Sequence, residues 1–350
     1  MSSAPTLDAF LSSYQQAGGG PRAAVAETVR ALAAAALKIR NEIGFGSSSG
    51  SFANAPGSTN ADGDVQRELD IVSDEIFLDA VRRAPVALYA SEELSTPIRL
   101  DPDAPLALAI DPLDGSSNID ANVSIGTIFS LLPATGGPGA DPTAPFLQPG
   151  NRQLAAGFFL YGPQFTLALS LGSGTHGFVF SSRLGTFVQV HESLRIAQTK
   201  PEFAINASNY RHWDDPIRLY VDDCLKGVEG PRARDFNMRW VASLVAETWR
   251  ILVRGGVFLY PGDHRPGYAK GRLRLVYEAN PIALLVEQAD GRATDAVTRI
   301  LDIEPESLHQ RVPLVFGASE EVTRIARYHT EPSAIAERSP LFGNRGLFRA

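Results

Sequence analysis

Two aspartates three residues apart are the first side chains in this sequence whose type and spacing suggest chemistry. Asp111 and Asp114 come after an apolar run, 106–110, which predicts a short buried strand that ends at the first carboxylate. Pro112 stiffens the link between the two acids, and Gly115 allows a sharp turn and a close approach to a ligand. Carboxylates bind hard divalent cations, and backbone N–H groups in such a turn bind phosphate.

Small hydrogen-bonding side chains continue this stretch at Ser116, Ser117 and Asn118. An Asp-Gly pair alone is typical of an ordinary turn. The complete run Asp-Pro-Leu-Asp-Gly-Ser-Ser-Asn after a strand is much more specific, and it predicts a site for a metal ion and a phosphate group.

The same design occurs earlier in the chain. An apolar run at 86–90 predicts a strand, and Glu92 and Glu93 follow it. Two such strands side by side would bring their carboxylates into one crevice, because open α/β sheets bind ligands at the carboxyl ends of strands. Asp64 and Asp70 lie near the start of an expected helix, where a carboxylate also favours the helix dipole. The dipole accounts for Asp64 better than for Asp70.

Together with Glu278, these acids would carry too much negative charge to share one site without cations. Two or three Mg²⁺ or Mn²⁺ ions would resolve this conflict, and the six scattered histidines and one cysteine form no zinc pattern. Paired metals suit phosphoryl transfer to water, and a nearby carboxylate can accept the proton. The sequence has no P-loop pattern, which argues against a nucleotide triphosphatase of that type.

Three arginines in the second half fit a phosphorylated substrate. Arg239, Arg272 and Arg274 could hold a second phosphate or a sugar oxygen, although each could equally be a solvated surface charge. Tyr260, which follows a buried strand, could pack in the core with its hydroxyl at the surface.

Hydrophobic periodicity and turn residues predict the elements that must position these side chains. Helices are expected at 23–43, 65–83, 215–227, 241–254 and 280–291. Strands are expected at 86–90, 106–110, 123–132, 154–161, 165–171, 177–180, 186–190, 203–206, 257–259 and 312–316. The polar segment 44–63 is expected to be a mobile functional loop or disordered, and 172–177 a hairpin turn.

The chain has 350 residues, a formal net charge of −7 and 44% hydrophobic residues, which fits a soluble globular protein of about two domains. The acidic balance argues against a general nucleic-acid binder. No apolar stretch is long enough for a membrane span and no secretory signal is found, so we expect a cytoplasmic protein without membrane partners. The single cysteine, Cys224, excludes a disulfide within the chain.

These stretches resemble the class I fructose-1,6-bisphosphatases, within the Mg²⁺-dependent, Li⁺-sensitive sugar-phosphatase superfamily. The matching positions are 57–60, 63–64, 69–70, 91–93, 111–120, 123–129, 255–261, 273–278, 280–281 and 309–311. The run at 111–116 is shared with inositol monophosphatases, whereas the motifs of the second half favour a bisphosphatase.

The resemblance implies an α/β fold in five layers, α-β-α-β-α, with mixed sheets and with helices between and outside them. It also implies two domains. Residues 1–195 would carry the metal and phosphate motifs, residues 196–335 would bind the sugar phosphate, and residues 336–350 would form a tail.

The resemblance further implies a role for each matched position. The metal ligands would be Glu92, Asp111, the Leu113 carbonyl, Asp114 and Glu278. The residues that position and deprotonate the attacking water would be Asp64, Asp70 and Glu93. The substrate would be bound at the cleaved phosphate by Asp114, Gly115, Ser116 and Ser117, and at the remote phosphate and sugar by Asn206, Asn209, Tyr260 and Arg272. Arg239 matches an arginine lent by a neighbouring subunit, which implies a homo-oligomer, often a tetramer.

The implied reaction is Mg²⁺-dependent hydrolysis of the 1-phosphate of fructose 1,6-bisphosphate to fructose 6-phosphate and phosphate, a step of gluconeogenesis and of the Calvin cycle. Sedoheptulose 1,7-bisphosphate remains an alternative or second substrate, because the sugar pocket is not legible from the sequence. An inositol-type monophosphatase would leave the second-half motifs unexplained. A catalytically silent sugar-phosphate-binding subunit would have no need of Asp70 or Glu93.

Some positions depart from the family pattern. Arg272 stands where the family usually has a lysine, which keeps the charge but changes the geometry. Trp240 replaces a phosphate-contacting tyrosine. The AMP site of the animal enzymes is poorly matched by residues 18–22 and by Pro105 and Leu106. We therefore expect weak or absent inhibition by AMP.

Overall fold

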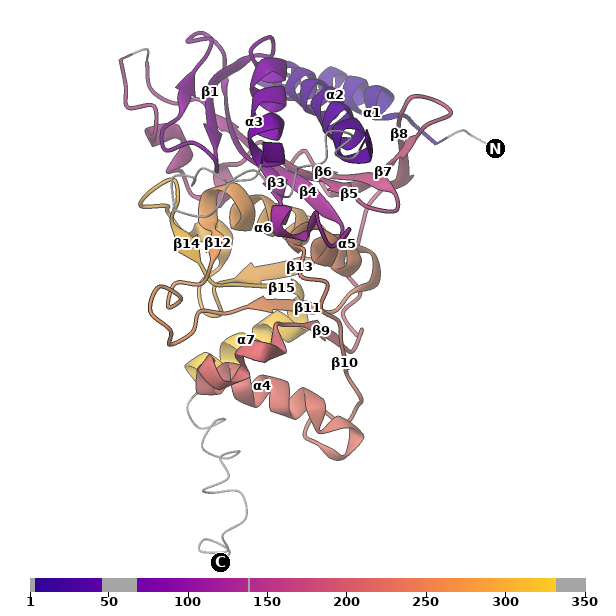
Figure 1. The fold of residues 1–350 in the computed structure, drawn as a ribbon, viewed down its shortest axis with the longest axis vertical. Coiled ribbons are helices and arrows are strands. Elements are labelled where there is room, and N and C mark those ends of the chain that lie inside the picture. The colour runs from indigo at the N-terminus through magenta and orange to yellow at the C-terminus, as the bar shows by residue number, and fades with distance from the viewer. Residues whose placement is uncertain (1–3, 46–67, 138, 332–350) are drawn as a thin grey trace, which may run out of the picture.

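The computed structural model describes residues 4–45, 68–137 and 139–331. Its elements stack in five layers, helices alternating with sheets from one end of the molecule to the other (Figure 1). The α/β fold with α-β-α-β-α layers is therefore confirmed. None of the helices in the described ranges combines the length and apolar character that crossing a membrane would require.

Three helices form the first layer, and they are α1 (Leu7–Gln16), α2 (Arg22–Phe45) and α3 (Glu68–Val81). An eight-stranded mixed sheet follows, with the order β2-β1-β3-β4-β5-β6-β7-β8. Its strands are β1 (Val86–Ser91), β2 (Ile98–Arg99), β3 (Leu106–Asp114), β4 (Ile125–Pro133), β5 (Ala155–Tyr161), β6 (Phe165–Ser170), β7 (Thr175–Ser181) and β8 (Thr186–His191).

Two helices between the sheets form the middle layer, and they are α5 (Leu244–Arg254) and α6 (Asn280–Glu287). The second sheet has the order β10-β9-β11-β15-β13. Its strands are β9 (Glu202–Ala204), β10 (Asn237–Met238), β11 (Val257–Tyr260), β13 (Gly291–Thr294) and β15 (Leu314–Ala318). A separate pair consists of β12 (Leu273–Arg274) and β14 (Arg311–Val312).

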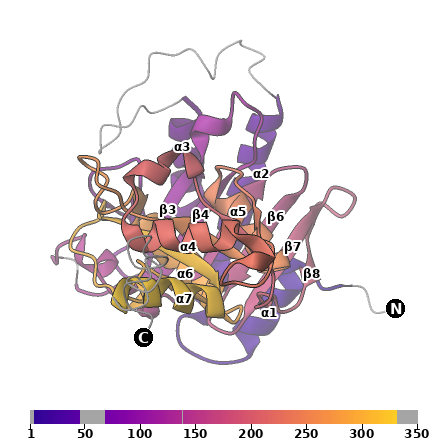
Figure 2. The same cartoon turned by 90° about the horizontal axis from the view of Figure 1, so that it is seen from below.

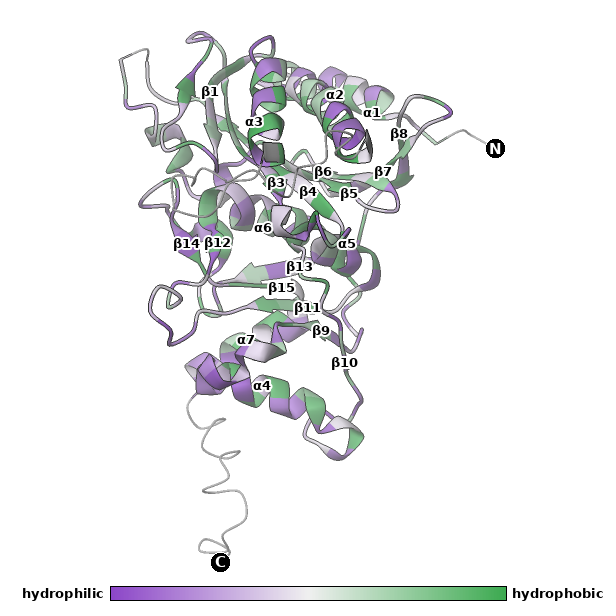
Figure 3. Cartoon of the chain, viewed as in Figure 1, coloured by the Kyte–Doolittle hydropathy of each residue, from purple (hydrophilic) through white to green (hydrophobic). Residues whose placement is uncertain are grey.

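The last layer consists of α4 (Asp215–Leu225) and α7 (Ser319–Thr330), which cover the far face of the second sheet and lie side by side when seen from below (Figure 2). Both helices alternate hydrophobic and hydrophilic residues, as expected of helices with one face on a sheet (Figure 3). The Tyr328 hydroxyl of α7 donates to Asp223 of α4 at 2.5 Å, which ties the two helices together.

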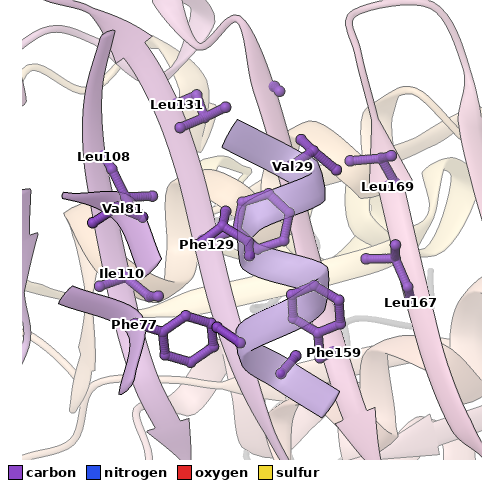
Figure 4. Packing of buried hydrophobic residues seen from close by; sticks show 14 of the residues in the cluster. Val29, Phe77, Val81, Leu108, Ile110, Phe129, Leu131, Phe159, Leu167 and Leu169 are labelled. Carbon is purple, nitrogen blue, oxygen red and sulfur yellow. The ribbon is translucent and has the colours of Figure 1, made fainter. Parts of the chain in front are cut away.

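The predicted apolar stripe of the long helix packs as expected. Val29 of α2 and Phe77 of α3 are fully buried and lie among Phe129, Phe159 and other side chains of the large sheet (Figure 4). Burying side chains of this size removes apolar surface from water, and each contributes roughly 1.5–3 kcal/mol. The helical layer therefore provides a rigid back to the strands that carry the acids.

The elements differ from the sequence prediction in a few places. The strand expected to end at residue 110 continues to Asp114, and the helix expected from residue 241 begins at Leu244, after the N-cap Ser243. The segment 172–177 is part of the hairpin between β6 and β7, as predicted. The loop predicted at 44–63 begins later than expected, because Gly44 and Phe45 still belong to helix α2, and its remaining residues lie outside the described part of the chain. The predicted tail at 336–350 also lies outside the described residues, and the domain division at residue 195 stays a prediction.

Gly126 of β4 marks a close approach between layers. A Cβ atom at this position would lie 2.3 Å from the Phe159 carbonyl oxygen and 2.7 Å from the Val245 side chain. Neither the paired strand β5 nor helix α5 can withdraw without breaking its own packing.

We expect Gly126→Ala to lower the free energy of unfolding by about 1–3 kcal/mol in a denaturant titration. Gly137→Ala is the control, because a Cβ there meets no described atom within 4 Å. Equal stability of the two variants would contradict this account.

Candidate active site

The carboxyl ends of two neighbouring strands carry the predicted acids. β1 and β3 are parallel partners, with Ser91 opposite Ile110. The Glu92 N–H donates to the Ile110 carbonyl at 3.0 Å, so the pairing continues one residue beyond β1. Glu92 and Glu93 therefore emerge beside Asp111, as predicted from the two strand ends.

A β-bulge then brings Asp111 and Asp114 together. In a regular strand, residues three apart point to opposite faces. Here Asp111 pairs with Ile128 and Asp114 pairs with Gly126, so two residues of β3, Pro112 and Leu113, oppose one residue of β4. The extra residue restores both carboxylates to the same side of the sheet. The strand was predicted to end at Ile110, and this was wrong because the bulge lets the ladder resume after the interruption.

The second half of the chain contributes Glu278 to the same place. Glu278 lies in a short π-helix, Leu275–Ala279, that leads directly into α6. Single-turn π segments are rare and occur often at functional sites. Carboxylate oxygens of Asp111, Asp114 and Glu278 all lie within 4.8 Å of one another, and the three residues are buried.

Helix α5 holds one of these carboxylates by its N-terminus. The Val245 N–H donates to Asp114 Oδ2 at 3.1 Å, and the Ser243 side chain caps the same helix by accepting from the Ala246 N–H. Asn118 Nδ2 donates to the Ala242 carbonyl at 2.7 Å. The predicted phosphate turn is thus joined to the second half of the chain through hydrogen bonds and a helix dipole.

Burial and mutual repulsion perturb the acids strongly. The pKa values of Glu92, Asp114 and Glu278 are raised to about 7. Burial is the largest cause, and repulsion from neighbouring acids adds to it. The pKa of Asp111 is raised well above its usual range by the same causes. Arg274 opposes this effect on Glu92, since its Nη1 lies 2.5 Å from Glu92 Oε1.

This donor set fits a hard divalent cation. The three clustered groups are all carboxylates, which are the oxygen ligands that Mg²⁺ and Mn²⁺ prefer. Their pKa values show that the charged forms are unfavourable at this depth without added positive charge. The structure therefore brings together the predicted ligands Glu92, Asp111, Asp114 and Glu278, and the Leu113 carbonyl lies within the bulge between the two aspartates.

Two of the three predicted water-positioning acids lie near this cluster. Asp70 is buried on α3 and is close enough to raise the pKa of Glu92. Glu93 likewise raises the pKa of Asp111, and its N–H donates to the Ser91 hydroxyl at 3.2 Å. Asp64 lies outside the described residues. The catalytic roles of these acids stay predictions.

The predicted phosphate turn has the expected backbone. Gly115 has φ +78°, in the left-handed region that favours glycine, and a 3₁₀ turn, Ser116–Asn118, follows it. Ser117 is exposed and Ser116 is partly exposed, so both hydroxyls lie at the surface of the site.

Three predicted substrate residues line a second, small pocket. Asn206, Asn209 and Tyr260 meet there, at one end of the second sheet. Asn206 Oδ1 accepts from the Ser208 N–H at 3.2 Å, which holds its side chain. Arg272 joins this group because its Nη1 donates to the Tyr268 hydroxyl at 2.7 Å.

Among the polar residues that line this pocket, Asp263, Arg265 and Tyr268 were not predicted from the sequence. The Arg265 guanidinium lies 4.1 Å from the centre of the Tyr268 ring and also pairs with Asp263. The loop after Tyr260 has no sequence pattern that predicts these contacts. The positive charge of the arginine side chain was the only indication that Arg265 could make them.

The remaining arginines are placed differently. Arg274 is buried in the acidic cluster against Glu92, away from the second pocket, and its contact with the substrate stays a prediction. Arg239 is absent from the pocket and follows the edge strand β10, with its side chain 55% exposed. The ring of Trp240 stacks on that of Phe258, with ring centres 5.9 Å apart, so Trp240 packs against the second sheet.

Comparison with known proteins shows the family. A family model described as "Fructose-1-6-bisphosphatase, N-terminal domain" matches residues 23–192, and one described as "Fructose-1-6-bisphosphatase, C-terminal domain" matches residues 196–330. The chain belongs to the fructose-1,6-bisphosphatase family. The family implies dependence on a divalent metal, and the buried acids are suited to hold one.

Individual relatives agree over nearly the full length. Fructose-1,6-bisphosphatase class 1 of Rhizobium meliloti (strain 1021) is 63% identical over 348 residues, which cover 99% of this chain and 100% of the relative. The class 1 protein of Rhodopseudomonas palustris (strain BisB18) is 52% identical over 328 residues, 94% of this chain and 94% of the relative. The crystal structure of Leishmania major fructose-1,6-bisphosphatase in holo form has a TM-score of 0.86 at 29% identity and covers 94% of this chain and 99% of that one.

The raised pKa values predict how the metal-free protein responds to pH. Between the usual carboxyl pKa of about 4 and the folded-state pKa of about 7, the folded state binds more protons than the unfolded state at Glu92, Asp114 and Glu278. The free energy of unfolding of the metal-free protein therefore falls as the pH rises through this range, and it stays low at higher pH. The stabilisation by Mg²⁺ should grow accordingly.

We expect the difference in Tm between samples with MgCl₂ and with EDTA to be larger at about pH 8 than at about pH 5.5. Glu278→Gln, which removes one of the titrating charges, should flatten the pH dependence of the EDTA sample. An EDTA sample whose Tm is independent of pH, with an equal Mg²⁺ effect at both values, would contradict the electrostatic account.

Proposed function

We propose that the chain hydrolyses the 1-phosphate of fructose 1,6-bisphosphate to fructose 6-phosphate and inorganic phosphate, with Mg²⁺ as its cofactor. The observation that supports this most is the junction of Asp111, Asp114 and Glu278 beside the turn at Gly115, in a chain 63% identical over 348 residues to a class 1 fructose-1,6-bisphosphatase. A buried acidic cluster next to backbone donors fits a phosphate held between cations and N–H groups.

The proposed work is divided among the chain's own residues. Glu92, Asp111, Asp114, Glu278 and the Leu113 carbonyl hold two or three Mg²⁺ ions, and Mn²⁺ is an alternative. When bound, these ions lower the pKa of water and neutralise charge on the phosphate. Asp70 and Glu93, together with Asp64, orient the attacking water and accept its proton. The backbone and hydroxyls at Gly115, Ser116 and Ser117 hold the phosphate that leaves the sugar.

The remote phosphate and sugar are assigned to the second pocket. Asn206, Asn209 and Tyr260 provide hydrogen-bonding groups, and Arg272 provides charge. Binding energy from this remote group orients the reacting phosphate for in-line attack. Arg239 is proposed to reach the site of a neighbouring subunit in a homo-oligomer, which we expect to be a tetramer; its exposure beside an edge strand supports this.

Phosphate release from a substrate panel tests the proposed function. The panel contains fructose 1,6-bisphosphate, sedoheptulose 1,7-bisphosphate, fructose 6-phosphate and inositol 1-phosphate, each with MgCl₂ and with EDTA. We expect Mg²⁺-dependent turnover of fructose 1,6-bisphosphate far above that of either monophosphate. Metal-independent turnover, or a preference for inositol 1-phosphate, would overturn the proposal. The sedoheptulose sample shows whether the chain acts on both bisphosphates.

The same assay with a charge-removing variant tests the site. Asp114→Asn keeps an oxygen for the Val245 N–H but removes the carboxylate, so kcat should fall by several orders of magnitude. Asp103→Asn, at an exposed position outside the cluster, should leave kcat unchanged. Near-normal turnover of Asp114→Asn would remove this residue from the metal site.

Regulation by AMP should be weak or absent. Pro105 and Leu106 stand where the animal enzymes have a lysine and a tyrosine, and Leu106 is fully buried in β3, where it offers no polar group to a nucleotide. A titration of AMP against the phosphatase activity checks this expectation. Half-inhibition by micromolar AMP would contradict it, while the substrate panel would stand.

A further inference from the structure

The bulge that unites Asp111 and Asp114 is held from the opposite strand by a pair of buried hydroxyls. Thr127 of β4 is the single residue that faces Pro112 and Leu113. Its hydroxyl donates to the Pro112 carbonyl at 2.8 Å, and it lies 2.9 Å from the Tyr161 hydroxyl of β5. The two side chains are 0% and 7% exposed, so water cannot replace these hydrogen bonds freely.

The direction of both hydrogen bonds follows from proton counting. A carbonyl oxygen can only accept, so the one hydroxyl proton of Thr127 points to Pro112. The Tyr161 hydroxyl must therefore donate to the Thr127 oxygen. The result is a relay in one direction, from Tyr161 through Thr127 to the carbonyl between the two aspartates.

The strand register explains how the relay reaches across the sheet. Thr127 pairs directly with Phe159, and Tyr161 is two residues farther along β5. Diagonal neighbours of this kind lie on the same face of a sheet and within reach of a long aromatic side chain. Tyr161 is itself held by stacking on Phe165, with ring centres 5.4 Å apart.

We infer that Thr127 and Tyr161 are positioning residues that set the geometry of the divalent-metal site by fixing the β-bulge at Pro112. Proline has no N–H, so the ladder cannot hold this part of the bulge in the usual way. The Thr127 hydroxyl supplies the missing restraint at the Pro112 carbonyl, and the two flanking aspartates take their positions from it. This inference rests on the metal site of the proposed function.

The chain offers a matched control. Thr166 of β6 is 1% exposed, and its hydroxyl has no hydrogen-bond partner within the described part of the chain. Thr166→Val and Thr127→Val therefore make the same chemical change at two buried strand positions of the same sheet. Only the second removes a hydrogen bond to the bulge. A role in packing alone would affect both variants similarly.

The test measures binding of Mg²⁺ and Mn²⁺ to the full chain by calorimetric titration without substrate. Removing a group that orients metal ligands typically costs about 10–100-fold in metal affinity. We expect Thr127→Val to raise the dissociation constant by about tenfold or more. Thr127→Ser, which keeps the hydroxyl, should restore most of the affinity, and Thr166→Val should bind as the unsubstituted chain does.

Tyr161→Phe provides a second, milder probe, since it leaves Thr127 in place but removes its donor. If Thr127→Val does not fold, Tyr161→Phe provides the test, and weaker metal binding by Tyr161→Phe supports the inference. Metal binding equal to that of Thr166→Val, in either folded variant, would overturn it. Because no substrate is present, a wrong sugar assignment cannot mimic this result. If the unsubstituted chain binds neither metal, the metal site of the proposed function fails as well.

Discussion

The repulsion among buried carboxylates is the constraint on which the rest of this structure depends. Asp111, Asp114 and Glu278 place oxygens within 4.8 Å of one another, where burial raises the pKa of each. Charges in such a place are unfavourable unless cations or hydrogen bonds compensate them. The protein must therefore hold the acids together in its metal-free form, and the N-terminus of α5 and the Arg274 guanidinium both oppose the repulsion.

This requirement explains why the two halves of the chain share one site. The first half contributes the strands β1 and β3, while Glu278 and the donors of α5 come from the second. α5 and α6 lie between the sheets and share a hydrophobic core with both of them. The relative position of the acids is thus set by packed layers that the core makes stiff. A site assembled this way combines the proposed phosphate turn on one sheet with the proposed sugar-phosphate pocket at the other.

Much of this arrangement was predictable from local patterns. Strands that end in carboxylates at Glu92 and Asp111 predicted that these acids lie side by side, and the parallel pairing of β1 with β3 confirms that the two strand ends are neighbours. Gly115 predicted a sharp turn, and the structure shows that this turn uses the left-handed region, with φ +78°. Helices α1 and α7 and the strands β2, β10 and β13 were missed. α7 is a mostly polar surface helix, and the three strands are too short to show an apolar pattern. Arg265 and Tyr268 were missed because their contacts depend on how one loop folds.

The sequence by itself determined which acids are available, the glycine turn that follows Asp114 and the family that these motifs indicate. These properties depend on residue type and short spacing, which a linear chain displays directly. Only the tertiary structure decided that Asp111 and Asp114 face the same way, that Arg274 joins the acids and that Thr127 faces the bulge. The reason is that side-chain direction in a sheet depends on register and bulges, and register is a property of paired strands.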